Sequence, residues 1–384
     1  MEYFRLIANI DLDAIANNIR QIRTKIKPET KLLAIVKADA YGHGALEVAR
    51  VSLYNGADQL AVATCDEGVS LRESSIGVPI LILGNTVDAQ LDKLIKNKLT
   101  QTVYSYTTAK KISDAAVRLG MPAFIHIKVD TGMGRIGLKS DEKGLDETDA
   151  IFSLPMLNVT GVFTHFATAD EADKTFTHEQ YRRFRFMTDG MEARGHKGLI
   201  RHCANSGAIL DMPEYQLDMV RAGIIIYGLF PSDAVNKNIN LIPAMNVHTQ
   251  VSFVKTVSGG TPIGYGRNYY TSGKTKIATI PIGYADGYPR LLSNKGKVIV
   301  NGEYANIVGN ICMDQAMIDV THLPNIKEGD DVIILGKSGL KSVTAEQIAQ
   351  LAQTINYEIV CNFSKRVPRA YYKNGECIYT VKSI

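Results

Sequence analysis

The sequence predicts an α/β fold: a (β/α)8 barrel of the TIM type followed by a mostly β C-terminal domain. Three observations support this prediction. The chain has 384 residues, which is too long for one ordinary domain. Short apolar runs alternate with helical patterns over the first part of the chain, and helical patterns become rare after about residue 240. We therefore expect the barrel at residues 1–240 and the β domain at residues 241–384, with the boundary in the segment 231–243.

The barrel prediction depends on the number of strands. A helix comes first, because Ile15, Ile19, Ile22 and Ile26 fall on one helical face. The strand-like runs that follow are residues 31–37, 59–64, 79–84, 101–104, 123–130, 158–165, 199–203 and 218–222. Helix-like segments separate them, for example 45–53, 89–97, 108–119 and 177–193. A doubly wound open sheet is the alternative, but eight strands separated by helices favour the barrel.

The C-terminal part has a different composition. Its Val- and Ile-rich segments are separated by glycine-containing turns, and they are residues 247–257, 276–284, 297–300, 304–311, 315–320 and 331–335. Only Ala345 to Thr354 has a helical pattern. Such a pattern is typical of a mostly β domain.

Composition and charge exclude several classes of protein. The net charge of +4 is small and no basic block occurs, which argues against nucleic acid as a partner. The five cysteines are far apart and include no Cys-x-x-Cys pair, which argues against disulfides and a thiolate metal site. The chain shows no signal peptide and no apolar stretch near the roughly 18 residues of a membrane span. We expect a cytoplasmic protein without a metal or membrane partner.

One strand predicts a polar barrel interior. In the segment 123–130, His126, Lys128 and Asp130 alternate with apolar residues, so these three should point into the lumen. Barrel lumens are usually packed with branched apolar side chains. The polar set therefore indicates that a functional site extends into the barrel.

The C-terminal ends of barrel strands form the active site in this fold. The residues that we expect there are Lys37, Asp130 to Arg135, His165, His202, Asn205, Ser206 and Arg221 to Gly223. Lys37 closes an apolar strand, where desolvation can lower the pKa of its amine and make it nucleophilic. Taken alone, a lysine that extends into water is the better interpretation. The Ser206 hydroxyl and the small Gly223 add a phosphate site, and the combination predicts pyridoxal phosphate.

Residues 34–44, AIVKADAYGHG, resemble the cofactor-attachment signature of bacterial alanine racemases. Further matching segments are residues 128–135, 164–166, 203–206, 221–223, 264–266, 283–287 and 312–314. The family fold is a barrel plus a β domain, in agreement with the prediction above. In that fold the N-terminal strand packs with the β domain, which implies that residues 1–10 belong to the second domain.

The resemblance also implies residue roles. Lys37 would bind pyridoxal phosphate covalently and exchange a proton on one face of the substrate α-carbon, while Tyr265 does so on the other. Arg135 and the backbone N–H of Met313 would bind the substrate carboxylate. Lys128 matches a position that is carbamylated (N6-carboxylysine) in many members, where it orients Arg135. Further cofactor contacts are implied for Tyr41, His165, Asn205, Ser206, Arg221, Gly223, Ile224 and Tyr357.

These implied roles agree with proton-transfer chemistry. Inversion of a stereocentre through a planar carbanion needs a proton acceptor on each face. A tyrosine titrates near ~10 in water, so Tyr265 needs cationic neighbours, and Arg221 and His165 are candidates. Arginine stays protonated, so Arg221 should donate to the pyridine nitrogen and leave that nitrogen unprotonated.

Other signals are weaker. Residues 132–137 match G-x-G-x-x-G, but the charged, turn-like segment 138–144 follows instead of an apolar helix, which argues against a dinucleotide. The histidines 165, 178, 196 and 202 lack a recognisable metal-ligand spacing and are expected to be structural or exposed. Gly264 stands where the family usually has Ser.

The expected function is an isomerase that interconverts L- and D-alanine and supplies D-alanine for peptidoglycan. The expected assembly is a homodimer in which Tyr265 and Met313 reach into the partner's barrel. One alternative is a racemase of broader amino-acid specificity, depending on how Tyr284 and Tyr357 narrow the entrance. Another is a non-catalytic pyridoxal-phosphate carrier, against which the β domain argues.

Overall fold

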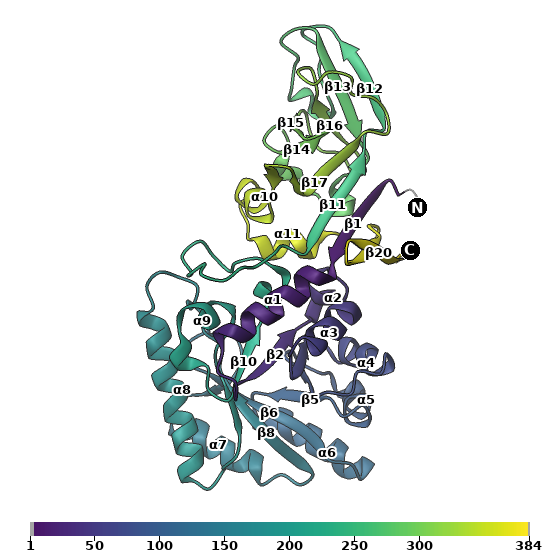
Figure 1. The fold of residues 1–384 in the computed structure, drawn as a ribbon. Coiled ribbons are helices and arrows are strands. Elements are labelled where there is room, and N and C mark those ends of the chain that lie inside the picture. The colour runs from purple at the N-terminus through teal and green to yellow at the C-terminus, as the bar shows by residue number, and fades with distance from the viewer. Residues whose placement is uncertain (1–3, 383–384) are drawn as a thin grey trace. The chain divides into compact units, whose positions relative to one another are not determined.

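The computed structural model describes residues 4–382 and divides into two compact units (Figure 1). One unit comprises residues 14–40 and 45–242. The other comprises the described residues up to Asp13, Tyr41–Gly44, and the chain from Pro243 onward. Residues 1–3, part of the segment expected to belong to the second domain, lie outside the described residues.

The first unit is a parallel barrel, which confirms the predicted fold class. In spatial order, its strands are β10 (Met219–Ala222), β2 (Lys31–Ile35), β3 (Gln59–Val62), β4 (Ile80–Ile82), β5 (Thr100–Val103), β6 (Ala123–Asp130), β8 (Leu157–Phe163) and β9 (Ile200–His202). A short strand, β7 (Leu138–Lys139), pairs with β6. Backbone hydrogen bonds from Asp218 N to Arg201 O (3.2 Å) and from Arg221 N to Ala204 O (2.9 Å) link β9 to β10. These bonds nearly close the barrel.

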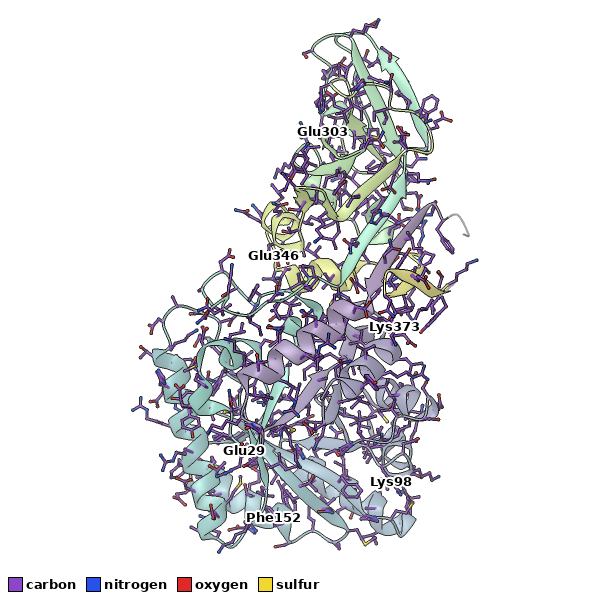
Figure 2. The ribbon with its side chains drawn as sticks, in the orientation of Figure 1. Glu29, Lys98, Phe152, Glu303, Glu346 and Lys373 are labelled. Atoms are coloured by element: carbon purple, nitrogen blue, oxygen red, sulfur yellow. The ribbon has the colours of Figure 1, made fainter. Side chains whose placement is uncertain are left out.

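Helices surround these strands (Figure 1). They are α1 (Leu12–Lys25), α2 (Lys37–Tyr41), α3 (Ala45–Tyr54), α4 (Cys65–Glu73), α5 (Leu91–Lys96), α6 (Tyr106–Leu119), α7 (Glu142–Phe152), α8 (Thr175–Ala193) and α9 (Ser206–Asp211), with short 3-10 turns η1 (Asp88–Gln90), η2 (Pro213–Tyr215) and η3 (Ile224–Tyr227). Side chains fill the space between helices and strands (Figure 2). Ile15, Ile19 and Ile22 of α1 are fully buried, as the periodicity predicts.

The interpretation of residues 138–144 as a turn is wrong in part. The segment contains β7 and the first residues of α7. Asp141 caps α7, because its side chain accepts a hydrogen bond from Gly144 N at 2.9 Å. A charged first turn after a capping aspartate favours a helix start. This signal identifies α7 although the segment carries few apolar residues.

The second unit is built on one large sheet. In spatial order, its strands are β12 (Phe253–Val257), β13 (Thr275–Ile280), β16 (Ala316–Asp319), β15 (Glu303–Ile307), β14 (Lys297–Val300), β17 (Asp331–Ser338), β11 (Met245–Gln250), β1 (Leu6–Asp11), β19 (Arg369–Lys373) and β20 (Glu376–Val381), and β18 (Lys341–Val343) pairs with β17. β1 pairs antiparallel with β11 and parallel with β19. The predicted run 247–257 therefore contains two strands that pair with different neighbours.

From Pro243 to the last described residue, this unit also contains the helices α10 (Ala345–Ala352) and α11 (Asn356–Asn362) and the turns η4 (Tyr265–Arg267), η5 (Tyr284–Asp286) and η6 (Arg290–Leu292). The prediction that 345–354 is the only helical segment is wrong, because α11 follows it. α11 is seven residues long and has no side-chain cap at Ile355, so a start signal is missing. Across residues 4–382, the helices are too short or too polar to cross a membrane.

Candidate active site

Lys37 lies just beyond the barrel strand that was expected to end with it. β2 ends at Ile35, and Lys37 begins the turn α2. The strand stops because Ala38, Asp39 and Ala40 adopt left-handed backbone angles, with φ 52° at each. Such angles cost roughly 1 kcal/mol or more per residue outside glycine. Three hydrogen bonds offset this cost: Ala40 N to Val36 O (2.9 Å), Ala38 N to Glu67 Oε1 (2.7 Å) and Ala45 N to Asp39 Oδ1 (2.8 Å).

Arg221 is a buried cation on β10, with 3% of its surface exposed. Its Nη2 donates to Thr164 O (2.8 Å) and Cys203 O (3.0 Å). Burial lowers the pKa of Arg221 to about 10, so the guanidinium remains protonated near neutral pH. Among the described residues, no carboxylate forms an ion pair with it. A buried, protonated donor without an anionic partner fits a ligand atom that accepts a hydrogen bond.

Two histidines contact this guanidinium. Nη2 of Arg221 lies 3.2 Å from Nδ1 of His165, and Nη1 lies 3.1 Å from Nδ1 of His202. A guanidinium only donates, so each Nδ1 accepts and each ring carries its proton on Nε2. Burial, followed by the charge of Arg221, lowers the pKa of both histidines well below the usual value. Both rings are therefore neutral. β8 ends at Phe163, two residues before His165, which was expected to end that strand.

A third histidine, His126 on β6, extends the hydrogen-bond chain from Arg221 through His202. Nε2 of His202 donates to Nδ1 of His126 at 3.0 Å, and burial lowers the pKa of His126 to about 3. The His126 ring passes over β8 at Gly161, where a Cβ would lie 2.7 Å from the ring. Side chains from β6, β9 and β10 thus meet inside the barrel, although β8 lies between β6 and β9 in the sheet. This arrangement agrees with a polar lumen. The His126–His202 pair was not found from the sequence, in which these histidines are 76 positions apart.

Lys128 lies on the same strand and is 3% exposed. Within residues 4–382, its buried Nζ has no hydrogen-bond partner, and it lies 5.2 Å from the centre of the Phe163 ring. Burial, with the charges of Arg221 and Arg135, lowers the pKa of Lys128 to about 7. A substantial fraction of this amine is therefore neutral at physiological pH. A neutral amine is a nucleophile, and a negative charge at this position would balance the two arginines.

The predicted phosphate residues of the barrel lie together. Gly223 N donates to Ser206 Oγ at 3.0 Å. Ser206 begins α9, and Asn205 caps that helix by accepting from Ala208 N at 3.1 Å. Ile224 begins η3 and is buried. Arg135 lies exposed in the loop after β6.

Tyr41 and Tyr357 form a second pair, in the other unit. Their ring centres are 6.0 Å apart. Burial raises the pKa of Tyr41, so its phenol remains neutral and can donate a hydrogen bond. Tyr265 begins η4 and is 74% exposed, and Met313 is 53% exposed.

The predicted site residues therefore divide between the two units. The barrel unit contains Lys37, Lys128, Arg135, His165, Asn205, Ser206, Arg221, Gly223 and Ile224, and the second unit contains Tyr41, Tyr265, Met313 and Tyr357. Among residues 4–382, no group of three histidine, cysteine, aspartate or glutamate side chains is placed to hold a metal ion.

Two family models match this chain. Residues 10–231 match the family model for the alanine racemase N-terminal domain, and residues 244–371 match that for the C-terminal domain. The chain is 50% identical to an alanine racemase of Clostridium perfringens over 98% of both chains. A solved alanine racemase of Clostridium difficile superposes with a TM-score of 0.95 at 44% identity, covering all of both chains. A solved histidine racemase of Leuconostoc mesenteroides gives a TM-score of 0.87 at 27% identity, covering 97% of this chain and 99% of that one.

Proposed function

This chain belongs to the alanine racemase family of isomerases, and we propose that it interconverts L- and D-alanine with pyridoxal phosphate as its cofactor. The observation that carries the proposal is Arg221, a protonated guanidinium buried at the strand ends and held by two neutral histidines. When bound, pyridoxal phosphate would supply an electron sink that makes the α-proton of an amino acid acidic.

Several residues of the barrel fit that cofactor. The Lys37 amine follows the end of β2, where we propose covalent attachment. Ser206, Gly223 and Ile224 offer a hydroxyl and backbone groups for the phosphate, with Asn205 ordering the turn. We assign Tyr41 and Tyr357 as further phosphate contacts, because a neutral phenol donates to an anion.

Arg221 would control the electronic character of the cofactor. Its guanidinium remains protonated, so it would donate to the pyridine nitrogen and leave that nitrogen without a proton. His165 would contact the cofactor beside it. An unprotonated ring withdraws electrons less strongly than a protonated one. Side reactions such as transamination should therefore be limited.

Lys37 and Tyr265 are proposed as the two bases. Lys37 would exchange the proton of D-alanine, and Tyr265 would act on the opposite face and exchange the proton of L-alanine. Arg135 and the backbone N–H of Met313 would hold the substrate carboxylate. Tyr265 and Met313 are exposed in the single chain, which supports a homodimer in which they complete the partner's site.

Lys128 is proposed to be carbamylated. Its neutral Nζ would form an N–C bond with CO₂ and release a proton to solvent, leaving a carbamate anion. The carbamate would add hydrogen-bond acceptors to a side chain whose Nζ has no partner among the described residues. Its negative charge would also attract Arg135 and Arg221. This charge would orient Arg135 toward the substrate.

A racemase of broader specificity is the second candidate. It is favoured by the histidine racemase among the similar structures, because that protein carries the same fold and acts on a larger amino acid. Tyr284 and Tyr357 are the residues we expect to limit substrate size. We further propose a cytoplasmic role in supplying D-alanine for peptidoglycan, and the five free cysteines suit a reducing compartment.

The test uses the cofactor-loaded protein and L-alanine in heavy water. We expect D-alanine carrying deuterium at Cα, and loss of this product in Lys37→Ala. Lys96→Ala, at an exposed site on α5, is the matched control and should retain activity. Lack of both exchange and racemisation in the loaded wild-type protein would replace the proposal with a non-catalytic cofactor carrier. Parallel assays with larger L-amino acids test the second candidate.

A further inference from the structure

Tyr265 lies in a closed loop between two glycines. Ile263 N donates to Tyr269 O at 3.0 Å, which closes residues 263–269 at their base. Gly264 and Gly266, on both sides of Tyr265, have a φ of 74°. Glycine reaches this region readily and rotates more freely than other residues. Because the Tyr265 side chain is exposed, its own packing within the chain does not fix the orientation of the loop.

One side chain from elsewhere in the unit contacts the backbone of Tyr265. Asn310 Nδ2 donates to Tyr265 O at 2.7 Å, and Asn310 is 8% exposed. The same amide lies beside Gly266, because a Cβ on Gly266 would be 3.3 Å from Asn310 Nδ2, and a Cβ on Gly264 would be 3.4 Å from the backbone N of Asn310. A buried donor at this distance restricts rotation of the peptide that follows Tyr265.

The segment that carries Asn310 is itself held by three hydrogen bonds to two other segments. Val308 N donates to Met317 O (2.9 Å), Gly309 N donates to Asn294 Oδ1 (2.6 Å), and Ile311 N donates to Ser293 Oγ (3.0 Å). Val308 and Ile263 also pack in one buried apolar cluster. Asn310 therefore projects from a rigid support.

The same segment continues to Met313. Tyr284 N donates to Cys312 O at 3.1 Å, and Ala285 N donates to Met313 O at 3.0 Å. The approach is close, since a Cβ on Gly283 would lie 2.2 Å from Met313 O. Residues 310–313 thus form one fixed piece of backbone, which contacts Tyr265 at one end and carries Met313 at the other.

We infer that Asn310 is a positioning residue, which holds the phenol of Tyr265 in register with the backbone N–H of Met313. The inference rests on the proposed function, in which Tyr265 is the base for L-alanine. Asn310 acts through the carbonyl of Tyr265 and touches neither substrate nor cofactor. Without its amide, the two glycines let the loop rotate and the phenol spends less time in its working position. Lys37, on a different unit, is unaffected.

Asn310→Asp tests the inference, because it preserves the size of the side chain but replaces the donor with an acceptor. The equilibrium constant for alanine is one by symmetry, so kcat/KM falls equally in both directions and cannot separate the bases. The informative quantity starts from D-alanine in heavy water. It is the amount of D-alanine that has gained deuterium at Cα, divided by the amount of L-alanine that has formed. In the proposed mechanism, Lys37 alone can return a deuteron and give deuterated D-alanine, whereas the formation of L-alanine also needs Tyr265.

We expect Asn310→Asp to raise this ratio about tenfold, which corresponds to the loss of one buried hydrogen bond. Tyr265→Phe should raise it further. The control Asn306→Asp, an exposed position on β15 of the same unit, should leave the ratio unchanged. An independent readout is amide hydrogen exchange of the cofactor-free protein. Residues 263–269 should exchange faster in Asn310→Asp than in wild type, and β13 should be unchanged.

The outcomes separate the two proposals. If Asn310→Asp leaves the ratio at the wild-type value while Tyr265→Phe raises it, the positioning role is wrong and the base assignment stands. If Tyr265→Phe also leaves the ratio unchanged, Tyr265 is not the second base and both proposals fall. Faster exchange of β13 in Asn310→Asp would show a general loss of structure and would overturn the positioning role.

Discussion

Nη1 of Arg221 lies 3.1 Å from Nδ1 of His202, and it also donates to the His202 carbonyl oxygen at 3.0 Å. One histidine thus provides two acceptors for one nitrogen of the guanidinium. Nη2 contacts His165 and two further carbonyls. The four N–H groups of Nη1 and Nη2 are shared among these five acceptors in a planar arrangement, which the three N–H groups of a lysine ammonium cannot reproduce.

Arg221→Lys should therefore lower kcat for alanine racemisation by about 10- to 100-fold and leave the proposed covalent attachment at Lys37 intact. The ammonium retains the charge but loses the geometry of the fork. The measurement is racemisation by the loaded enzyme, with cofactor absorbance to show that loading is complete. Arg201→Lys on β9, where the arginine pairs with Asp218 at 2.9 Å, is the control and should stay close to wild type. Equal activity of Arg221→Lys and wild type would contradict a directional role for the guanidinium.

Lys128 predicts a specific pH dependence of stability. Its pKa in the folded chain is about 7, well below the unfolded value near ~10.4. Between these values the unfolded chain binds more protons, so the contribution of Lys128 to the free energy of unfolding rises with pH. Below pH 7 the burial penalty is complete, and it disappears as pH approaches the unfolded value.

Lys128→Met should consequently stabilise the cofactor-free chain at pH 6, by up to about 3 kcal/mol, and have little effect near pH 10. Urea unfolding in CO₂-depleted buffer measures this difference. Addition of bicarbonate at pH 8 should stabilise wild type but leave Lys128→Met unchanged, because only wild type has an amine to carbamylate there. A stability difference that does not vary with pH would contradict the lowered pKa.

Much of the fold is predictable because the barrel strands are separate apolar runs. The eight runs all become strands, and the alternation in 123–130 places His126 and Lys128 in a polar interior. The left-handed turn after Val36 is not predictable, because Ala38 and Ala40 do not favour it locally. Glu67, from another part of the chain, helps to stabilise it. Local propensity says little where a distant side chain decides the backbone.

Local sequence also predicts only part of the candidate site. Single residues at strand ends, such as Arg221 and Ser206, are identifiable from their position after an apolar run. Contacts between distant parts of the chain are not, because no spacing connects His126 to His202 or Asn310 to Tyr265. These contacts become visible only when the three-dimensional arrangement of the strands and loops is known.

Gly264 gives a prediction about backbone strain. Its φ of 74° and ψ of −174° lie in a region that is essentially restricted to glycine. A Cβ at this position would also lie 2.8 Å from Cε of Met317. Gly264→Ala should therefore destabilise the chain by about 1–3 kcal/mol and displace the Tyr265 loop.

A double mutant separates the two causes. Thermal unfolding of Gly264→Ala, Met317→Ala and the pair gives the coupling between the sites. If the contact with Met317 dominates, the second substitution should recover part of the loss. If the backbone dominates, the effects should add. A Gly264→Ala chain as stable and active as wild type would contradict both.

Subunit mixing tests whether Tyr265 acts on the partner's site. In the proposed mechanism, Lys37→Ala removes one base and Tyr265→Phe removes the other, so each proposed homodimer should be inactive. If Tyr265 serves the partner, a mixed dimer has one site with both substitutions and one site with neither. Random exchange makes half the dimers mixed, so recovery should approach about one quarter of wild-type activity. If each chain serves its own site, every site in a mixed dimer lacks one base, and mixing restores nothing. Mass spectrometry under native conditions checks that mixed dimers have formed, so that absent recovery refutes the shared site.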